Sequence, residues 1–412
     1  MYSSLFIKFI TFFILITITS VSSGPVKCPP IDSTEYSAAQ ERYIVFLSND
    51  KDHYKWLKKC YNRPVQNIKI TKKSVDVDKN SILDISIEGK FYAYITWYYP
   101  EFAEKYISER PETILVEKDS PVKIATVQKN PTPNLDRIDQ ADFPLNNEYV
   151  FPSSAGSDAT VYVIDTGVMI THEEFEGRAS FLGVFCAGCP DTDDNGHGSH
   201  VSGIIGGKTY GVAKNVNIVG VKVLNSKGRG NMADLVASLS SVLKDVMLKK
   251  NNAIINMSLG GEFSLAFNRI IQSLTANGIH VVVAAGNEAS DACNVSPASE
   301  PSAITVGATE DKSNGITNFS NFGKCVDIFA PGRNILSVGI QSNTSTAIFS
   351  GTSQATPHVA GTVALIISKF GNQKPGDMVN TLVDFSTKNI IPNTKGSPNN
   401  FLRIPPPYLL YR

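Results

Sequence analysis

The sequence predicts an α/β fold, in which helices cover both faces of a mainly parallel sheet, preceded by a small α+β domain. Two observations lead to this prediction: short apolar, β-branched runs alternate with longer helical stretches after about residue 135, and the segment before it has a different character. We expect strands at residues 161–164, 217–223, 253–256, 279–284 and 304–306, and helices near residue 200 and at 233–248, 265–277 and 353–368.

The N-terminal residues have the pattern of a signal peptide. Residues 5–21 are almost wholly apolar, interrupted by Lys8, and the stretch ends in Val21-Ser22-Ser23-Gly24. We therefore expect a signal peptide at residues 1–23, with an uncleaved anchor as the alternative, and no other run is apolar and long enough to span a bilayer.

Residues 24–126 read as a separate small α+β domain. Strand-like runs at 43–47 and 91–95 flank helical and polar stretches, and both tryptophans, Trp56 and Trp97, fall here. We expect a larger domain at residues 127–412.

Composition excludes a nucleic-acid-binding protein. The 412 residues are 42% hydrophobic and have zero formal net charge, as expected of a globular protein. No basic cluster is longer than the pairs Lys58-Lys59 and Lys72-Lys73, so no surface could track a phosphate backbone.

The segment Gly351-Thr352-Ser353-Gln354-Ala355-Thr356-Pro357 places a serine at the start of an apolar helix. Gly351 allows a tight turn before Ser353, and the first amides and positive dipole end of the helix would face its hydroxyl. Pro357 fits this prediction, because early helical positions have no intrahelical partner for the missing N–H. An ordinary capped core helix is the alternative.

Two further segments supply the partners that a nucleophilic serine needs. Asp165 ends the β-branched run Val161-Tyr162-Val163-Ile164, at the strand end where α/β folds place their sites. His197 lies in the glycine-containing loop Asp194-Asn195-Gly196-His197-Gly198, before a helix of small residues. Histidine suits proton transfer near neutral pH, and a carboxylate can orient it.

With these three segments the chain resembles the subtilases, the subtilisin-like serine peptidases, and among them the proteinase K-like branch. The order Asp165, His197, Ser353 is the order of the subtilisin triad. The likeness runs from about Leu135 to the C-terminus and includes Asn256-Met257-Ser258-Leu259-Gly260-Gly261, Ala284-Ala285-Gly286-Asn287, Ser296-Pro297-Ala298-Ser299-Glu300-Pro301 and Asp327-Ile328-Phe329-Ala330-Pro331-Gly332. Gln354 departs from the family, which usually has methionine there, and a buried amide would need hydrogen-bond partners.

The resemblance implies a three-layer subtilisin-like fold and an endopeptidase without a catalytic cofactor. Ser353 would attack the peptide carbonyl, His197 would transfer the proton, and Asp165 would orient His197. Asn287 would donate to the oxyanion, with a turn residue as the alternative. His200 and His358 are expected to be packed groups.

The resemblance also implies where a peptide would bind. An extended substrate would add as a strand, and small apolar pocket walls would favour aliphatic or aromatic side chains. The residues implied are Gly228, Arg229, Gly230, Asn231, Met232, Ser258, Leu259, Gly260, Ala284, Ala285 and Gly286.

A structural calcium site and a disulfide framework follow from the same resemblance. Asp327 with the carbonyls of Pro301 and Ala303 matches a calcium site of the branch, with a turn or capping role for Asp327 as the alternative. If residues 24–126 are a prosegment that is removed, they cannot share a disulfide with the rest of the chain, and this favours the pairs Cys28–Cys60 and Cys293–Cys325. The second pair resembles a disulfide of some relatives. Cys186 and Cys189 would close a very small third ring.

Residues 24–126 resemble the inhibitory prosegment of subtilases, with a last strand at 113–119 and an exposed cleavage site within 123–133. A permanent N-terminal domain is the alternative. We expect a secreted, self-processed monomer that binds protein or peptide substrates and its own prosegment, with glycans at Asn318 and Asn343.

Three other functions are alternatives to the peptidase. An aspartic protease would need a second Asp-Thr-Gly or Asp-Ser-Gly, which the sequence lacks. A zinc module would use Cys186, Cys189, His197 and His200. A catalytically silent binding protein on the subtilase scaffold is the main alternative.

Overall fold

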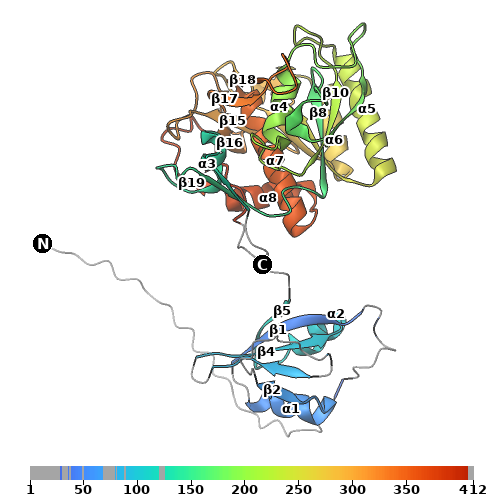
Figure 1. Ribbon diagram of the computed structural model, residues 1–412, viewed down its shortest axis with the longest axis vertical. Coiled ribbons are helices and arrows are strands. Elements are labelled where there is room, and N and C mark those ends of the chain that lie inside the picture. The colour runs from blue at the N-terminus through green and yellow to red at the C-terminus, as the bar shows by residue number, and fades with distance from the viewer. Residues whose placement is uncertain are drawn as a thin grey trace, which may run out of the picture. The chain divides into compact units, whose positions relative to one another are not determined.

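The computed structural model describes residues 28–29, 36, 39–48, 51–67, 79, 81–87, 90–119 and 126–406. The chain forms two compact units, Met1–Val122 and Lys123–Arg412 (Figure 1). The signal-peptide prediction at 1–23 and the first residues of the predicted cleavage site lie outside the described residues.

The first unit is a five-stranded sheet with a helix beside it. The strand order is β2-β3-β4-β1-β5, and an aromatic core that includes Tyr43, Trp56, Tyr94 and Phe102 packs against it. The elements are β1 (Glu41–Leu47), α1 (Lys51–Tyr61), β2 (Val65–Asn67), β3 (Ile82–Asp84), β4 (Tyr92–Tyr98), α2 (Pro100–Phe102), the π-helix η1 (Ala103–Ile107) and β5 (Thr113–Lys118).

The second unit is built on a nine-stranded sheet of order β19-β20-β16-β15-β13-β11-β8-β10-β9. All neighbours are parallel except β19 and β20. Its strands are β8 (Ala159–Asp165), β9 (Ala179–Val184), β10 (Asn217–Lys222), β11 (Asn252–Met257), β13 (His280–Ala284), β15 (Ile304–Thr309), β16 (Ile328–Pro331), β19 (Thr387–Lys388) and β20 (Asn400–Phe401).

Helices cover both faces of this sheet, so the predicted three-layer α/β fold is confirmed. The helices are α3 (Pro133–Asp139), α4 (His197–Gly206), α5 (Met232–Lys249), α6 (Leu265–Ala276), α7 (Thr352–Phe370) and α8 (Pro375–Phe385), with 3₁₀ turns η2 (Glu173–Phe175) and η3 (Ala292–Asn294). Short two-stranded pairs join β6 (Thr126–Lys129) with β7 (Glu148–Phe151), β12 (Gly261–Glu262) with β14 (Val295–Ser296), and β17 (Ile335–Val338) with β18 (Thr346–Phe349).

The central strand β8 shows how the layers arise from the sequence. Val161 and Val163 join the core that includes α4, α7 and α8, whereas Tyr162 and Ile164 join the core that includes α5 and α6. Successive side chains of a strand point to opposite faces, so a continuous apolar run is what a strand covered on both faces requires.

Helix α7 corrects one step of the sequence argument. Pro357 is the sixth residue of α7, not a first-turn residue, so its missing N–H leaves the carbonyl of Ser353 without its usual helical donor. The hydroxyl of Ser258 donates to that carbonyl instead, at 2.8 Å. The proline is tolerated because a side chain from outside the helix replaces the lost hydrogen bond.

The predicted cleavage site is not wholly a linker. Thr126–Lys129 forms β6, which pairs antiparallel with β7, and α3 begins at Pro133. No β-branched run in this segment is long enough to identify the strand from the sequence, and its conformation depends on pairing with Glu148–Phe151.

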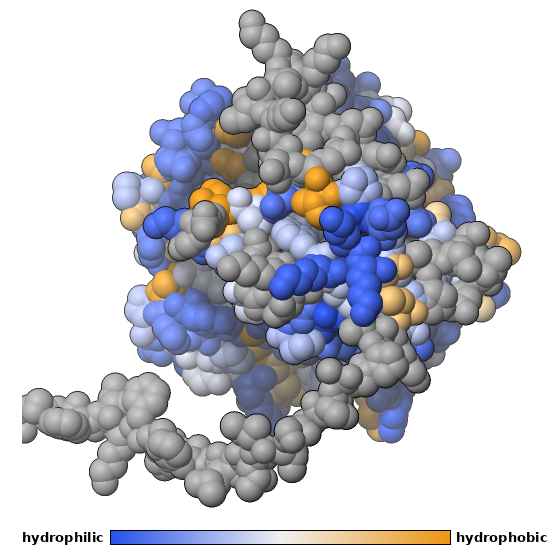
Figure 2. Space-filling view, turned by 90° about the horizontal axis from the view of Figure 1, so that it is seen from below, coloured by the Kyte–Doolittle hydropathy of each residue, from blue (hydrophilic) through white to orange (hydrophobic). Residues whose placement is uncertain are grey.

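The structure contains three disulfides, Cys28–Cys60, Cys186–Cys189 and Cys293–Cys325. No helix in the described part of the chain is long and apolar enough to cross a membrane. Figure 2 shows one face of the molecule, on which hydrophilic residues cover most of the described surface and hydrophobic residues form separate small patches.

Candidate active site

Asp165 lies at the carboxyl end of β8 and is fully buried. Its Oδ1 and Oδ2 atoms lie 2.8 and 3.0 Å from Nδ1 of His197, and Oδ1 also accepts the Thr166 amide at 2.7 Å. The carboxylate thus orients the imidazole through Nδ1 and leaves Nε2 for another partner.

His197 is the first residue of α4, and a quarter of its side chain is exposed. Burial on its own would lower the pKa of His197, but the charge and hydrogen bond of Asp165, with the charge of Asp193, raise this pKa above its ordinary value. The imidazole therefore takes up a proton more readily than a free histidine.

Asp193, which the sequence analysis missed, holds the loop that carries His197. Its carboxylate accepts five hydrogen bonds: from the hydroxyls of Thr166 and Ser199 and from the amides of Asn195, Gly196 and Ser199. It thereby caps the first turn of α4 and ties it to the residue after Asp165. An aspartate shortly before a helix start is the sequence signal that could have identified it.

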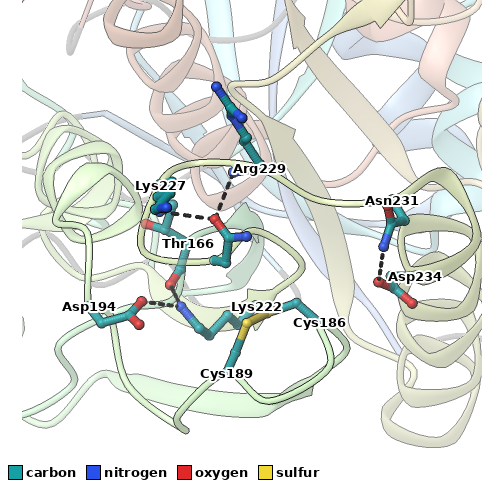
Figure 3. The surroundings of a disulfide bond; sticks show 10 residues. Thr166, Cys186, Cys189, Asp194, Lys222, Lys227, Arg229, Asn231 and Asp234 are labelled. Carbon is teal, nitrogen blue, oxygen red and sulfur yellow. Dashed lines mark hydrogen bonds and ion pairs between the residues drawn. A yellow bond between two sulfur atoms is a disulfide. The ribbon is translucent and has the colours of Figure 1, made fainter.

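Lys222 makes a second tie between these segments (Figure 3). Its fully buried ammonium group donates to the carbonyl of Thr166 at 2.5 Å and to Oδ1 of Asp194 at 2.6 Å. A buried charge is stable only when it is paired and hydrogen-bonded, so Lys222 joins the end of β10 to the end of β8 and to the His197 loop.

Gly198 is required by the same close packing. A Cβ atom at Gly198 would lie 2.1 Å from the carbonyl oxygen of Gly167. Only glycine allows α4 to approach the turn after β8 so closely.

Ser353 is the second residue of α7 and lines the same cleft as His197. Its amide lies in the first turn of the helix, where amides have no intrahelical acceptor. Its hydroxyl donates to the carbonyl of Ser258 at 3.0 Å, and the structure contains no hydrogen bond between the described residues Ser353 and His197. In this conformation the hydroxyl proton is directed to Ser258 and not to His197.

The carboxamide of Asn287 is fixed by Thr352. Oδ1 of Asn287 accepts the amide of Thr352 at 2.8 Å and its hydroxyl at 3.0 Å. Nδ2 has no acceptor among the described residues, and Asn287 lines the cleft. The two donors of Thr352 thus decide which end of the amide is free, and this free end is a hydrogen-bond donor.

The other histidines near these segments are packed in the core. His200 is fully buried, stacks on Phe349 at 4.4 Å and contacts the carbonyl of Ile335, and burial lowers its pKa to about 4. His358 contacts Asn134 and the Gln354 carbonyl.

The zinc hypothesis is wrong, because Cys186 and Cys189 form a disulfide and His197 is bound to Asp165. No group of three or more His, Cys, Asp or Glu side chains in the described residues could hold a metal.

The cleft is lined by ten of the eleven residues that we predicted to bind substrate. They are Gly228, Arg229, Gly230, Asn231, Met232, Ser258, Leu259, Gly260, Ala284 and Gly286. Ala285 does not line the cleft: it is fully buried in the core on the α7 face, because alternation along the chain turns it away from Ala284.

Two of the glycines that line the cleft present open backbone edges. No hydrogen bond within the described part of the chain uses the peptide groups of Gly230 or Gly260. A Cβ atom at Gly230 would lie 2.4 Å from the carbonyl oxygen of Val223, so only glycine lets the backbone run this close to Val223. Unpaired peptide groups of this kind can accept an added strand.

The cleft also has acidic residues that the sequence analysis did not consider. Glu262 and Glu288 line it, and the carboxylate of Glu288 accepts a hydrogen bond from Asn321 at 2.8 Å. Glu288 directly follows Asn287, and Glu262 follows Gly260-Gly261, so adjacency to predicted site residues was the available signal.

Gln354 is buried beside the serine, and 2% of it is exposed. Its Nε2 group has no hydrogen-bond partner among the described residues. The departure from the family pattern therefore places an unsatisfied polar group next to Ser353, which costs stability.

Asp327 precedes β16 and is half-buried. Its Oδ2 accepts the Thr305 amide at 2.8 Å, and Oδ1 has no donor among the described residues. Burial raises the pKa of Asp327 to about 6, opposed by that hydrogen bond. A desolvated carboxylate with one free oxygen, beside the chain that enters β15, fits a hard cation such as calcium.

The second unit is similar to known proteins over most of its length. The Subtilase family model matches residues 156–402. Subtilisin-like protease 2 of Pseudogymnoascus destructans is 45% identical over 254 residues, which are 62% of this chain and 63% of that protein. The chain thus spans less than two thirds of that relative's length.

Two further proteins match over longer shares. An extracellular serine proteinase of Thermus sp. is 40% identical over 301 residues, 73% of this chain and 72% of that protein. The crystal structure of a cold adapted subtilisin-like serine proteinase is 41% identical with a TM-score of 0.63, and the match covers 67% of this chain and 98% of that one. The resemblance drawn from the sequence is confirmed: the chain belongs to the subtilase family.

Proposed function

We propose that this chain is a serine endopeptidase that cleaves peptide bonds with Asp165, His197, Ser353 and Asn287. One observation carries the proposal: an imidazole oriented by a buried carboxylate shares a cleft with a serine hydroxyl and a fixed carboxamide donor. These are the parts that acyl transfer to serine needs.

In the first half of the reaction, Ser353 Oγ turns from the Ser258 carbonyl and attacks the peptide carbonyl carbon. Nε2 of His197 takes the hydroxyl proton, and the Asp165 carboxylate stabilises the resulting imidazolium. The negative charge on the former carbonyl oxygen is met by Nδ2 of Asn287 and the Ser353 amide.

In the second half, His197 gives its proton to the leaving nitrogen, the C–N bond breaks, and an ester on Ser353 remains. Water then attacks the ester carbon, and His197 removes a proton from this water. The C–O bond to Ser353 breaks, Oγ regains a proton from His197, and an acid product leaves.

Substrate would bind as an added strand along Gly230 and Gly260. Their free peptide groups in the cleft support this mode, and the cleft residues Ala284 and Gly286 leave room for a side chain. Because an added strand must be an extended polypeptide, the substrates would be proteins or peptides.

We further propose secretion as a zymogen. The signal-peptide pattern at residues 1–23, the separate compact first unit and a relative named as extracellular support this proposal. The prosegment, residues 24–126, would inhibit the peptidase until a cut within 123–128 releases it. A monomer, glycans at Asn318 and Asn343, and a calcium ion held by Asp327 with the carbonyls of Pro301 and Ala303 belong to the same proposal.

Replacing Ser353 with alanine is expected to lower kcat by about 10⁶-fold, the cost that loss of this serine has in subtilisin. It should also leave the secreted protein uncut between the two units. The measurements are turnover of a quenched peptide and the mass of the secreted protein, with Ser350→Ala as the control. Normal turnover in Ser353→Ala would contradict the proposal, and no turnover in the natural protein would favour the silent binding protein.

Replacing Asn287 with alanine is expected to lower kcat by about 10² to 10³, the range that loss of one such donor has in subtilisin. The reason is that Nδ2 meets charge that exists only in the transition state. Steady-state kinetics would check this expectation. A large rise in KM at unchanged kcat would instead place Asn287 in ground-state binding.

Chelation is expected to lower Tm at pH 8 and to have much less effect at pH 5. The folded-state pKa of Asp327 is raised, so without a cation stability falls as pH rises from about 4 through about 6, and a bound cation offsets the loss above pH 6. Asp327→Asn should remove the chelator effect, and the exposed Asp158→Asn should keep it. A chelator effect that survives Asp327→Asn would contradict this site.

The isolated segment 24–126 is expected to inhibit the mature peptidase at sub-micromolar concentration, an affinity of about −8 kcal/mol or better. A segment cut back to residue 118 keeps β5 but lacks the tail that would occupy the cleft, and it should inhibit much more weakly. Inhibition constants from progress curves would compare them. Equal inhibition by both segments would show that the tail does not enter the cleft.

A further inference from the structure

The charged side chains of the cleft are divided between its walls. Arg229 lies on the loop between β10 and α5, whereas Glu262 and Glu288 lie on the segments after β11 and β13. Apart from His197, Arg229 is the single basic residue among the described residues that line the cleft. A bound peptide would therefore meet positive charge along one edge and negative charge on another.

Arg229 is exposed, and no carboxylate of the described residues forms an ion pair with it. Asp234, five residues further along the chain, contacts Asn231 instead, at 3.4 Å. Figure 3 shows the Arg229 side chain directed away from both Asp194 and Asp234. Its guanidinium group has donors spaced to bind a carboxylate at two points.

The turn that carries Arg229 is held in place by Asn225. The side-chain Oδ1 of Asn225 accepts hydrogen bonds from the backbone amides of Lys227 and Arg229, at 2.9 and 3.2 Å. The backbone amide of Asn225 donates to the Arg229 carbonyl at 2.9 Å. The side chain of Asn195 adds a hydrogen bond to the carbonyl of Ser226 at 2.9 Å. Arg229 therefore projects from a fixed backbone, directly before the open peptide groups of Gly230.

We propose that Arg229 makes the peptidase prefer substrates with an aspartate or glutamate at the position of the added strand whose side chain faces Arg229. This inference rests on the proposed function. Side chains of paired strands that face each other interact when their charges are opposite, and no carboxylate of the described residues competes for Arg229. Glu262 and Glu288, on other segments that line the same cleft, repel an acidic side chain, so the charges favour its binding next to Arg229.

Paired peptides that differ only in glutamate or glutamine measure this preference. The pairs place that residue at each position from four before to two after the scissile bond, and kcat/KM is compared at low salt. The natural protein should favour glutamate about fivefold at one position, the size of an exposed ion pair of about 1 kcal/mol. The ratio should fall toward one in 0.5 M NaCl.

Variants of the same turn separate a direct contact from general charge. Arg229→Gln should bring the ratio to about one, and Arg229→Glu should reverse it. Lys227→Gln is the matched control, since Lys227 is exposed on the same turn but does not line the cleft, and it should keep both the ratio and the activity.

A ratio near one at every position in the natural protein would overturn the inference, as would an equal loss in Lys227→Gln and Arg229→Gln. Failure of the proposed function is distinct, because then neither peptide of any pair is cleaved. The dissociation constants of the same peptides with Ser353→Ala read the charge preference without turnover. Equal constants for the glutamate and glutamine peptides would also overturn it.

Discussion

The buried carboxylate of Asp165 is the constraint around which the site is organised. A desolvated negative charge is stable only with donors close by, and Asp165 obtains them from the Thr166 amide and Nδ1 of His197. His197 must therefore be brought to the end of β8 and held there. Asp193 and Lys222 do this by binding the residue after Asp165 and the loop before His197. The stability of the fold and the orientation of the imidazole thus depend on the same hydrogen bonds.

The central part of the fold could be predicted because its strands are covered on both faces. Five strands and four helices agree with their predicted positions, since continuous β-branched runs alternate there with amphipathic or small-residue helices. The strands at the sides of the sheet escaped prediction for a physical reason. Ala179–Val184 is only half-buried, and Thr387–Lys388 has two residues, so pairing with neighbours decides their conformation more than their own sequence does.

The sequence could predict site residues whose role depends on their own residue type. It could not predict hydrogen bonds between segments that come together only in the folded chain. The sequence could indicate Asp165, His197, Ser353 and Asn287, whose residue types and family motifs are specific. It could not show that Ser258 accepts from the Ser353 hydroxyl and donates to the carbonyl that Pro357 leaves without a donor. That contact joins segments 95 residues apart and exists only once α7 has packed beside the end of β11.

The buried residues of the site cannot change without loss of stability, whereas the exposed residues of the cleft can. Asp165, Asp193 and Lys222 are buried, and each is hydrogen-bonded to other residues of the site, so changing any of them leaves an unpaired charge or donor inside the protein. Arg229 is exposed and takes part in the fold through its backbone, which Asn225 binds whatever the side chain is. Its charge can therefore be exchanged at little cost to folding. A substrate preference carried by such a residue can change while the proposed catalytic groups stay in place, because the two depend on different interactions.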